Sequence, residues 1–168
     1  MPEFLNSSFG LKLTIEQTVR EIIRFMTADP RRRYKVTVGT DSDRLANGSA
    51  DFVTAVVIHR VGNGGRYFWR RFQLGKFHTL RDRIIKEVLI SLELGKQILT
   101  ALKALSDEAA AGGLPLPEWD FEIHVDIGEN GPTKPMIQEV VGMIRASNFE
   151  AKTKPESYAA SNVADRHV

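Results

Sequence analysis

The chain has 168 residues and no cysteine. It is long enough to bury a core of its own, and disulfides, zinc–cysteine sites and thiol catalysis are excluded. Its hydrophobic content of 42% and charged content of 26% are typical of globular proteins. No apolar run approaches the length of a membrane span, so we expect no membrane partner. The net charge of +2, with clustered arginines, is weakly compatible with a polyanionic partner. The N-terminus lacks a signal-peptide pattern, and we expect a cytoplasmic protein.

The first half of the chain predicts a helix followed by three strands. The helix covers residues 14–29, begins with a capping-box pattern at Thr14 and Gln17, and ends at Asp29-Pro30. Turn signals at Asn47-Gly48 and at residues 63–65 separate three runs of strand character. The expected strands cover residues 34–41, 52–59 and 66–74.

The second half alternates helices and strands. We expect a long helix over residues 80–105, a strand over 119–126, a helix over 135–146, a strand over 149–154 and a short last helix from Tyr158 onward. After the leading helix the order is βββ-α-β-α-β-α, which predicts the α/β fold class, with a mixed five-stranded sheet flanked by helices. We expect one domain, residues 1–168, in which residues 1–30 are an N-terminal helical extension and residues 31–168 form the core.

Two apolar strands each run directly into an aspartate, Asp41 in the first strand and Asp126 in the fourth. Strand alternation places both on the side opposite the bulky residues, so if the two strands are neighbours, both carboxylates emerge from one sheet face. A helix covering that face could deliver Glu87, which interrupts the apolar stretch of the long helix, whereas Glu93 looks more solvated. A further acid, Asp165, lies in the closing segment.

Convergence of these acids would be costly without a cation. Two carboxylates about 4 Å apart repel by roughly 4 kcal/mol at an effective dielectric near 20, and a domain's net stability is only about 5–15 kcal/mol. Either the acids stay apart, some are protonated, or a metal neutralises them. Oxygen ligands favour Mg²⁺ or Mn²⁺. The structural alternatives are Asp41 and Asp126 as turn residues, Glu87 as a partner of Arg83, and Asp165 as a surface acid.

The element order and the acids resemble the ribonuclease H-like fold, in which acids stand on the first strand, the first helix, the end of the fourth strand and the last helix. The matching residues here are Asp41, Glu87, Asp126 and Asp165. More narrowly, the chain resembles the YkuK-type family of uncharacterised ribonuclease H-like proteins over nearly its whole length. The segments that carry this resemblance are residues 38–42, 124–128, 133–134 and 152–161.

The resemblance implies a fold and an acidic site. Together with the acids it leads us to expect a divalent-metal-dependent nuclease that hydrolyses phosphodiester bonds of RNA, DNA or a hybrid. Asp41 would bridge two Mg²⁺ or Mn²⁺ ions, Asp126 and Glu87 would each bind one ion or orient water, and Asp165 would complete the second site. Basic residues would contact the substrate through its phosphates. The expected substrate-binding residues are Lys134, Lys154, Arg70 and Arg71.

Two non-enzymatic functions remain alternatives. The same scaffold could hold nucleic acid or a protein without cutting it, which a weakly held last helix would favour. The leading amphipathic helix could instead mediate a homodimer, because its apolar face must be buried somewhere.

Overall fold

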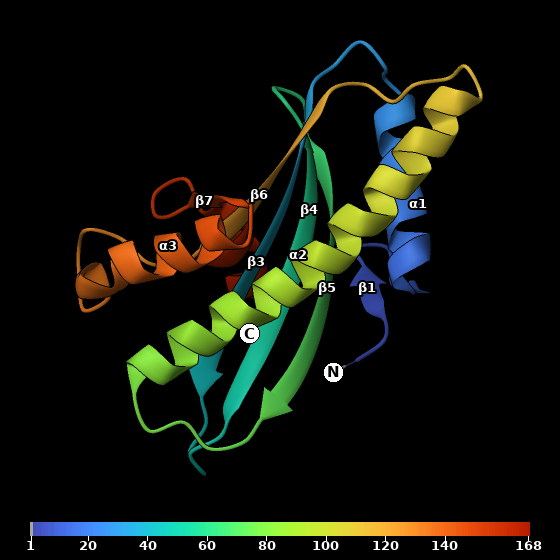
Figure 1. Cartoon of the computed structure of the whole chain (residues 1–168). Coiled ribbons are helices and arrows are strands. Elements are labelled where there is room, and N and C mark those ends of the chain that lie inside the picture. The colour runs from blue at the N-terminus through green and yellow to red at the C-terminus, as the bar shows by residue number, and fades with distance from the viewer. Residues whose placement is uncertain (1) are drawn as a thin grey trace.

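Three long antiparallel strands form the centre of the sheet in the computed structural model, which describes residues 2–168. They are β3 (Tyr34–Arg44), β4 (Ala50–Arg60) and β5 (Gly65–Leu74). Strand β6 (Trp119–Val125) lies parallel to β3, and β7 (Glu150–Lys152) lies parallel to β6. The predicted fold class, a mixed sheet flanked by helices with an additional N-terminal helix, is confirmed (Figure 1).

The sheet is wider than the five strands expected from the sequence. Two short strands, β1 (Leu5–Ser7) and β2 (Lys12–Leu13), extend it beyond β5, so the full order is β2-β1-β5-β4-β3-β6-β7. These strands are three and two residues long, too short to show an alternating pattern in the sequence. Backbone pairing holds β1 against β5 and β2 against β1.

Helices α1 (Ile15–Thr27) and α2 (Leu80–Ala111) cover one face of the sheet, which is the near face in Figure 1. The predicted capping box is present: Gln17 N–H donates to Thr14 Oγ1 (3.1 Å), and Thr14 N–H donates to Gln17 Oε1 (2.9 Å). Helix α2 runs past the predicted end near Leu105 through an alanine-rich stretch that we expected to be a loop. Alanine has the highest helix propensity, which accounts for the extension.

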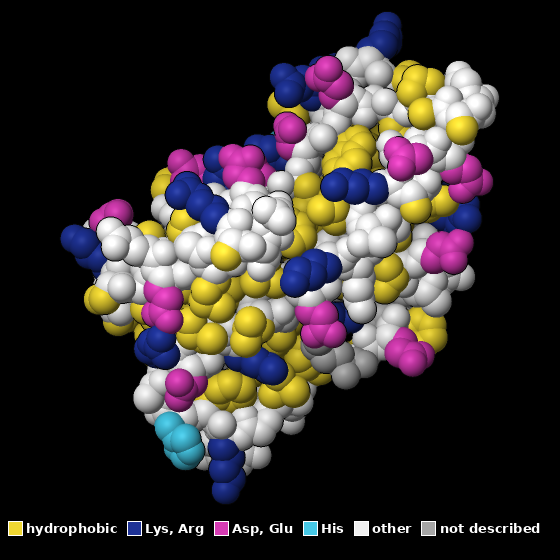
Figure 2. Space-filling model, in the orientation of Figure 1, with side chains coloured by type: hydrophobic (Ala, Val, Ile, Leu, Met, Phe, Trp, Pro, Cys, Tyr) yellow, Lys and Arg dark blue, Asp and Glu magenta, His cyan; other side chains and the backbone are white. Residues whose placement is uncertain are grey.

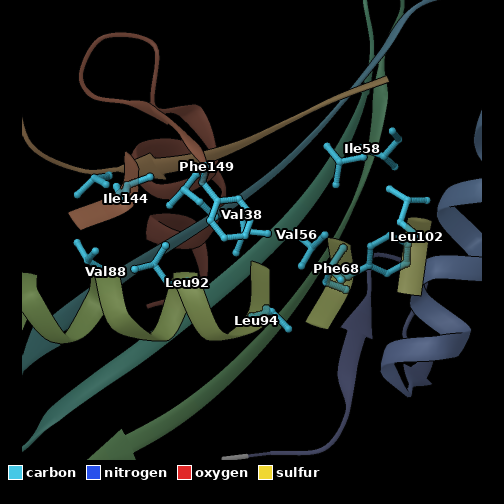
Figure 3. Close-up of a cluster of buried hydrophobic side chains, with 14 of the residues drawn as sticks. Val38, Val56, Ile58, Phe68, Val88, Leu92, Leu94, Leu102, Ile144 and Phe149 are labelled. Carbon is cyan, nitrogen blue, oxygen red and sulfur yellow. The ribbon is translucent and has the colours of Figure 1, made fainter. Parts of the chain in front are cut away.

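The main core lies between this helical layer and the sheet. Figure 3 shows side chains of β3, β4 and β5 meeting those of α2. The apolar face of α1 joins the same core, and its Val19, Ile22 and Met26 have no exposed surface. The apolar face of α1, which suggested a homodimer because it must be buried somewhere, is therefore buried within the chain itself. Within residues 2–168, no helix combines the length and apolar character that a membrane crossing needs.

Helix α3 (Ile137–Ala146) packs beside β7 and follows a short 3₁₀ turn, η1 (Lys134–Met136). The predicted last helix is a π-helical segment, η2 (Ala159–Ala164), followed by a 3₁₀ turn, η3 (Asp165–His167). This closing segment contacts β3, β4 and β6 on the face away from α2 (Figure 1). Its backbone approaches Gly39 so closely that a Cβ atom there would lie 2.5 Å from Ala160 N.

Candidate acidic site

Asp41 and Asp126 lie side by side at one end of the sheet. The parallel pairing of β3 with β6 ends at Thr40 and Val125. Asp41 directly follows Thr40, and Asp126 directly follows Val125. The condition set by the sequence analysis, that the first and fourth strands be neighbours, is therefore met. Both aspartates line a cavity of about 260 Å³, together with Glu87 and Lys154.

The electrostatics of Asp41 show how close the acids are. The pKa of the Asp41 carboxyl is raised to about 7, by burial first, then by the charge of Asp126 and by the hydrogen bond and charge of Asp165. A hydrogen bond from the Ser42 backbone opposes the shift. The carboxyl of Asp41 therefore keeps its proton to a higher pH than an ordinary aspartate, as expected of a partly buried acid beside other acids.

Glu87 reaches the site from the opposite face of the sheet, which corrects our expectation that its helix covers the face of the aspartates. Helix α2 packs on the side of Thr40, whose Oγ1 lies 2.7 Å from Ser91 Oγ. Ser42 donates a 2.5 Å hydrogen bond to Glu87 Oε1, and Glu87 is only 5% exposed. The pKa of Glu87 is raised to about 8, mainly by burial and to a lesser extent by the charges of Asp41 and Asp126. The acids meet around the end of the strands, not over one face.

Two alternatives to Glu87 as a site residue were that it pairs with Arg83 and that Glu93 takes its place. Arg83, one turn earlier, donates to the carbonyl oxygen of Ser42 (2.6 Å) and to its hydroxyl (3.2 Å). Its charge lowers the pKa of Glu87, but burial outweighs it. Glu93, the competing helical acid, is exposed and lines a different cavity with Arg70.

Asp165 is brought to the site by the docked closing segment. Ser161, four residues earlier, donates a 2.7 Å hydrogen bond from Oγ to Asp126 Oδ1. At the start of the segment, Ala159 N–H donates to His124 Nδ1 at 3.1 Å. Asp165 then lies close enough to raise the pKa of Asp41.

A buried polar chain beneath the closing segment was not predicted. Because His124 Nδ1 accepts from Ala159, its proton is on Nε2 and is donated to Glu122 Oε2 at 3.0 Å. Lys35 Nζ lies 3.1 Å from the other oxygen, Glu122 Oε1. Burial alone would raise the pKa of Glu122, but its hydrogen bonds with His124 and Lys35 lower it overall. The alternation of Glu122, His124 and Asp126 on one side of β6 was the signal that could have revealed this chain.

The predicted substrate-binding residues are spread over the molecule. Lys154 Nζ lies 3.1 Å from Asp126 Oδ1, so it belongs to the site. Lys134 is exposed and lies 3.8 Å from Glu129. Arg71 pairs with the buried Asp51. Arg70 is only 4% exposed, and its Nη1 donates to the Pro2 carbonyl (3.1 Å). Burial lowers the pKa of Arg70, and its side chain lines a cavity with Glu93, apart from the acidic site.

The four carboxylates have the chemistry of a site for a hard divalent cation, which prefers oxygen ligands. Yet no group of three or more Asp, Glu or His side chains within residues 2–168 is arranged to hold a metal ion. Asp126 and Glu87 already have other partners. Ser161 and Lys154 already contact Asp126 Oδ1, and Glu87 Oε1 accepts from Ser42.

The surface of the helical face carries positive and negative side chains interspersed with apolar ones (Figure 2). Such a mixed surface has no continuous stripe of one charge along which a nucleic-acid backbone could be held. The acidic site at the end of the strands is therefore a stronger candidate functional site than the helical face.

The sheet order and the acids at its end define a ribonuclease H-like protein. The chain belongs to the Ribonuclease H-like family, whose model matches residues 17–168. It is similar to a protein of Bacillus subtilis (strain 168) named "Uncharacterized protein YkuK", with 33% identity over 157 residues, covering 92% of this chain and 91% of the relative. The predicted resemblance is thus confirmed. No solved structure matches the chain significantly.

Proposed function

We propose that this protein is a divalent-metal-dependent nuclease that hydrolyses phosphodiester bonds of nucleic acid. The observation that carries the proposal is the convergence of Asp41, Glu87, Asp126 and Asp165, from four distant parts of the chain, with the pKa of Asp41 raised to about 7 and that of Glu87 to about 8. Burial and mutual repulsion both oppose the charged forms of these acids, and a group of acids perturbed in this way is a candidate functional site. Membership of the Ribonuclease H-like family supports a nucleic-acid substrate.

The residues that would hold Mg²⁺ or Mn²⁺ are the two strand aspartates, with Glu87 and Asp165 completing the set. Such ions supply an activated water and stabilise the leaving oxygen of a phosphodiester. The chain's own contribution is positional. Pairing of β3 with β6 fixes Asp41 beside Asp126, and Ser42 orients Glu87.

The test is a melting experiment with Mn²⁺ combined with a cleavage assay. At about 100 times its dissociation constant a metal adds roughly 2.7 kcal/mol of stability, which for a domain of this size raises the melting point by roughly 5–10 °C. We expect this shift in the wild type and its loss in Asp126→Asn. The matched control is Asp120→Asn, because Asp120 lies on the same strand with a side chain that is 61% exposed.

Cleavage of RNA, DNA and hybrid substrates is then measured with the same proteins. We expect metal-dependent cutting by the wild type and by Asp120→Asn, and none by Asp41→Asn or Asp126→Asn. Cutting that persists in both active-site variants, or that needs no metal, would refute the mechanism.

A second candidate function is a nucleic-acid-binding module that does not cut. The favouring observation is that the positive charge of Lys154 contacts Asp126, while no three or more Asp, Glu or His side chains in residues 2–168 are arranged to hold a metal ion. This function predicts nucleic-acid binding in the presence of a chelator and no melting shift with millimolar Mn²⁺. The melting experiment therefore separates the two functions.

A further inference from the structure

Lys154 places its ammonium group against a carboxylate of the acidic site. Its Nζ lies 3.1 Å from Asp126 Oδ1, the oxygen that also accepts the hydrogen bond from Ser161. The parallel pairing of β6 with β7 ends at His124 and Lys152. Asp126 and Lys154 each follow two residues later, so the sheet register itself brings them together. A positive charge thus occupies the surroundings in which a cation would contact Asp126.

The backbone of Lys154 is held in place independently of its side chain. Its N–H donates to the Ile127 carbonyl at 2.8 Å. Gly128 permits the close approach, because a Cβ atom there would lie only 2.9 Å from Lys154 Cβ. The side chain is 49% exposed, so the ammonium group can turn towards solvent or a ligand without any movement of the main chain.

A cation and the ammonium group cannot both use the same carboxylate oxygen at full strength. Two positive charges a few ångströms apart repel, and this repulsion grows as water is excluded from the cavity. Asp126 Oδ1 already accepts one hydrogen bond from Ser161. A divalent ion that binds there must therefore displace Lys154 or bind less tightly beside it.

We propose that Lys154 is an internal counterion that competes with a divalent cation for Asp126, and that cation binding releases its ammonium group to a phosphate of the nucleic acid. This inference rests on the proposed metal-dependent function. Thermodynamic linkage makes the effect reciprocal: a phosphate that holds Lys154 away from Asp126 favours the cation, and the cation favours the phosphate. Lys154 is then a positioning residue that couples the two ligands.

The first experiment measures Mn²⁺ binding to the full chain by titration calorimetry. Lys154→Met is expected to bind roughly two- to fivefold more tightly than the wild type, the range of a partly exposed ion pair. Lys154→Arg keeps the charge and should stay near the wild type. The matched control is Lys152→Met, because Lys152 is two residues away and pairs with Glu150 (3.3 Å) instead of an acid of the site.

The outcomes separate this inference from the proposed function. Tighter binding in Lys154→Met than in Lys152→Met, or binding in Lys154→Met alone, supports the competition. Equal affinities in the wild type, Lys154→Met and Lys152→Met overturn the competition but leave the metal site in place. No binding in any of them overturns both. Lys154→Gln and melting without metal verify that the substitution has not disturbed the fold.

The second experiment tests the release step with an uncleavable phosphorothioate oligonucleotide. Its affinity is measured by fluorescence anisotropy in chelator and in Mg²⁺. We expect Mg²⁺ to strengthen binding by the wild type and by Lys152→Met, and to do so less in Lys154→Met. An equal Mg²⁺ response in the two variants would overturn the release of Lys154 to a phosphate.

Discussion

The two faces of the sheet are built from the same strands but have different chemistry. On the side of α1 and α2, β3 presents Val36 and Val38, which are fully buried among aliphatic side chains. On the side of the closing segment the same strand presents Lys35 and Asp41, beside a buried chain of polar groups. Because neighbouring residues of a strand point to opposite faces, one sequence segment serves both.

The two faces of the sheet contribute differently to stability and to function. The apolar face gains free energy by removing hydrocarbon from water. The polar face instead contains Asp41, whose raised pKa shows that its charged form is held at a cost in free energy. Glu87 links the two, because it belongs to the helix of the apolar face and reaches the acids through Ser42. Substitutions on the two faces should therefore differ in magnitude, in sign and in their effect on metal binding.

The largest expected effect is on the apolar face. Leu94 of α2 has no exposed surface, and Leu94→Ala should lower the free energy of unfolding by about 2–5 kcal/mol. The measurement is urea denaturation. The matched control is Leu89→Ala on the same helix, where the side chain is 47% exposed and the loss should be much smaller. A loss at Leu94 no greater than at Leu89 would contradict the assignment of the core.

The next effect is on the opposite face, where Gly39 admits the backbone of the closing segment. Gly39→Ala would place a Cβ atom 2.5 Å from Ala160 N, and crowding of this kind costs about 1–3 kcal/mol. We expect faster hydrogen exchange in residues 158–167 and weaker Mn²⁺ binding. The control is Gly142→Ala in α3, where a Cβ atom meets nothing within 4 Å. Unchanged exchange in Gly39→Ala would refute the docking role.

Features of the fold that depend on local sequence patterns could be predicted, whereas features that depend on packing could not. The helix starting at Thr14 and the alternation of β3 are local patterns, and both were predicted. Strand parity placed Asp41 and Asp126 on corresponding sides of their strands, and the structure adds that the two strands are neighbours. The face from which Glu87 approaches depends on how α2 packs over the whole sheet, which no local pattern encodes.

Other features needed contacts between distant residues. The ion pair of Lys154 with Asp126 depends on the register of β7, a strand of three residues. The buried Arg70 donates a hydrogen bond to Pro2, which lies far away in sequence. Long-range packing decided both, and the sequence pattern of arginines does not distinguish the buried Arg70 from the half-exposed Arg71.

A smaller effect, of opposite sign, is expected for Asp41. Its pKa is raised in the folded protein to about 7 from 3.8, so the folded state holds more protons than the unfolded state between these values, and stability falls as pH rises through them. Asp41→Asn removes this loss. Without metal, the variant should be more stable than the wild type at pH 8, by about 1–2 kcal/mol after allowance for partial exposure.

Thermal melting at pH 4 and pH 8, in chelator and in Mn²⁺, measures this prediction. In chelator the advantage of Asp41→Asn should shrink as the pH approaches 4, where the wild-type carboxyl is largely protonated in the folded state. Saturating Mn²⁺ at pH 8 should reverse the order, because only the wild type gains the metal. A variant that is less stable than the wild type in chelator at pH 8 would show that Asp41 is a structural hydrogen-bonding residue instead.

The smallest effect is expected from the same change of charge on the outer surface of the helical layer. Glu16 in the first turn of α1 has a side chain that is 68% exposed and lies 2.9 Å from Arg20. Glu16→Gln should lower stability by only about 0.3–0.5 kcal/mol, the contribution of a helical i,i+4 ion pair. Urea denaturation at low and high salt measures it, since screening should remove most of the difference. A gain in stability, as expected for Asp41→Asn, would mean that exposed and clustered carboxylates behave alike, and the contrast between the two regions would fail.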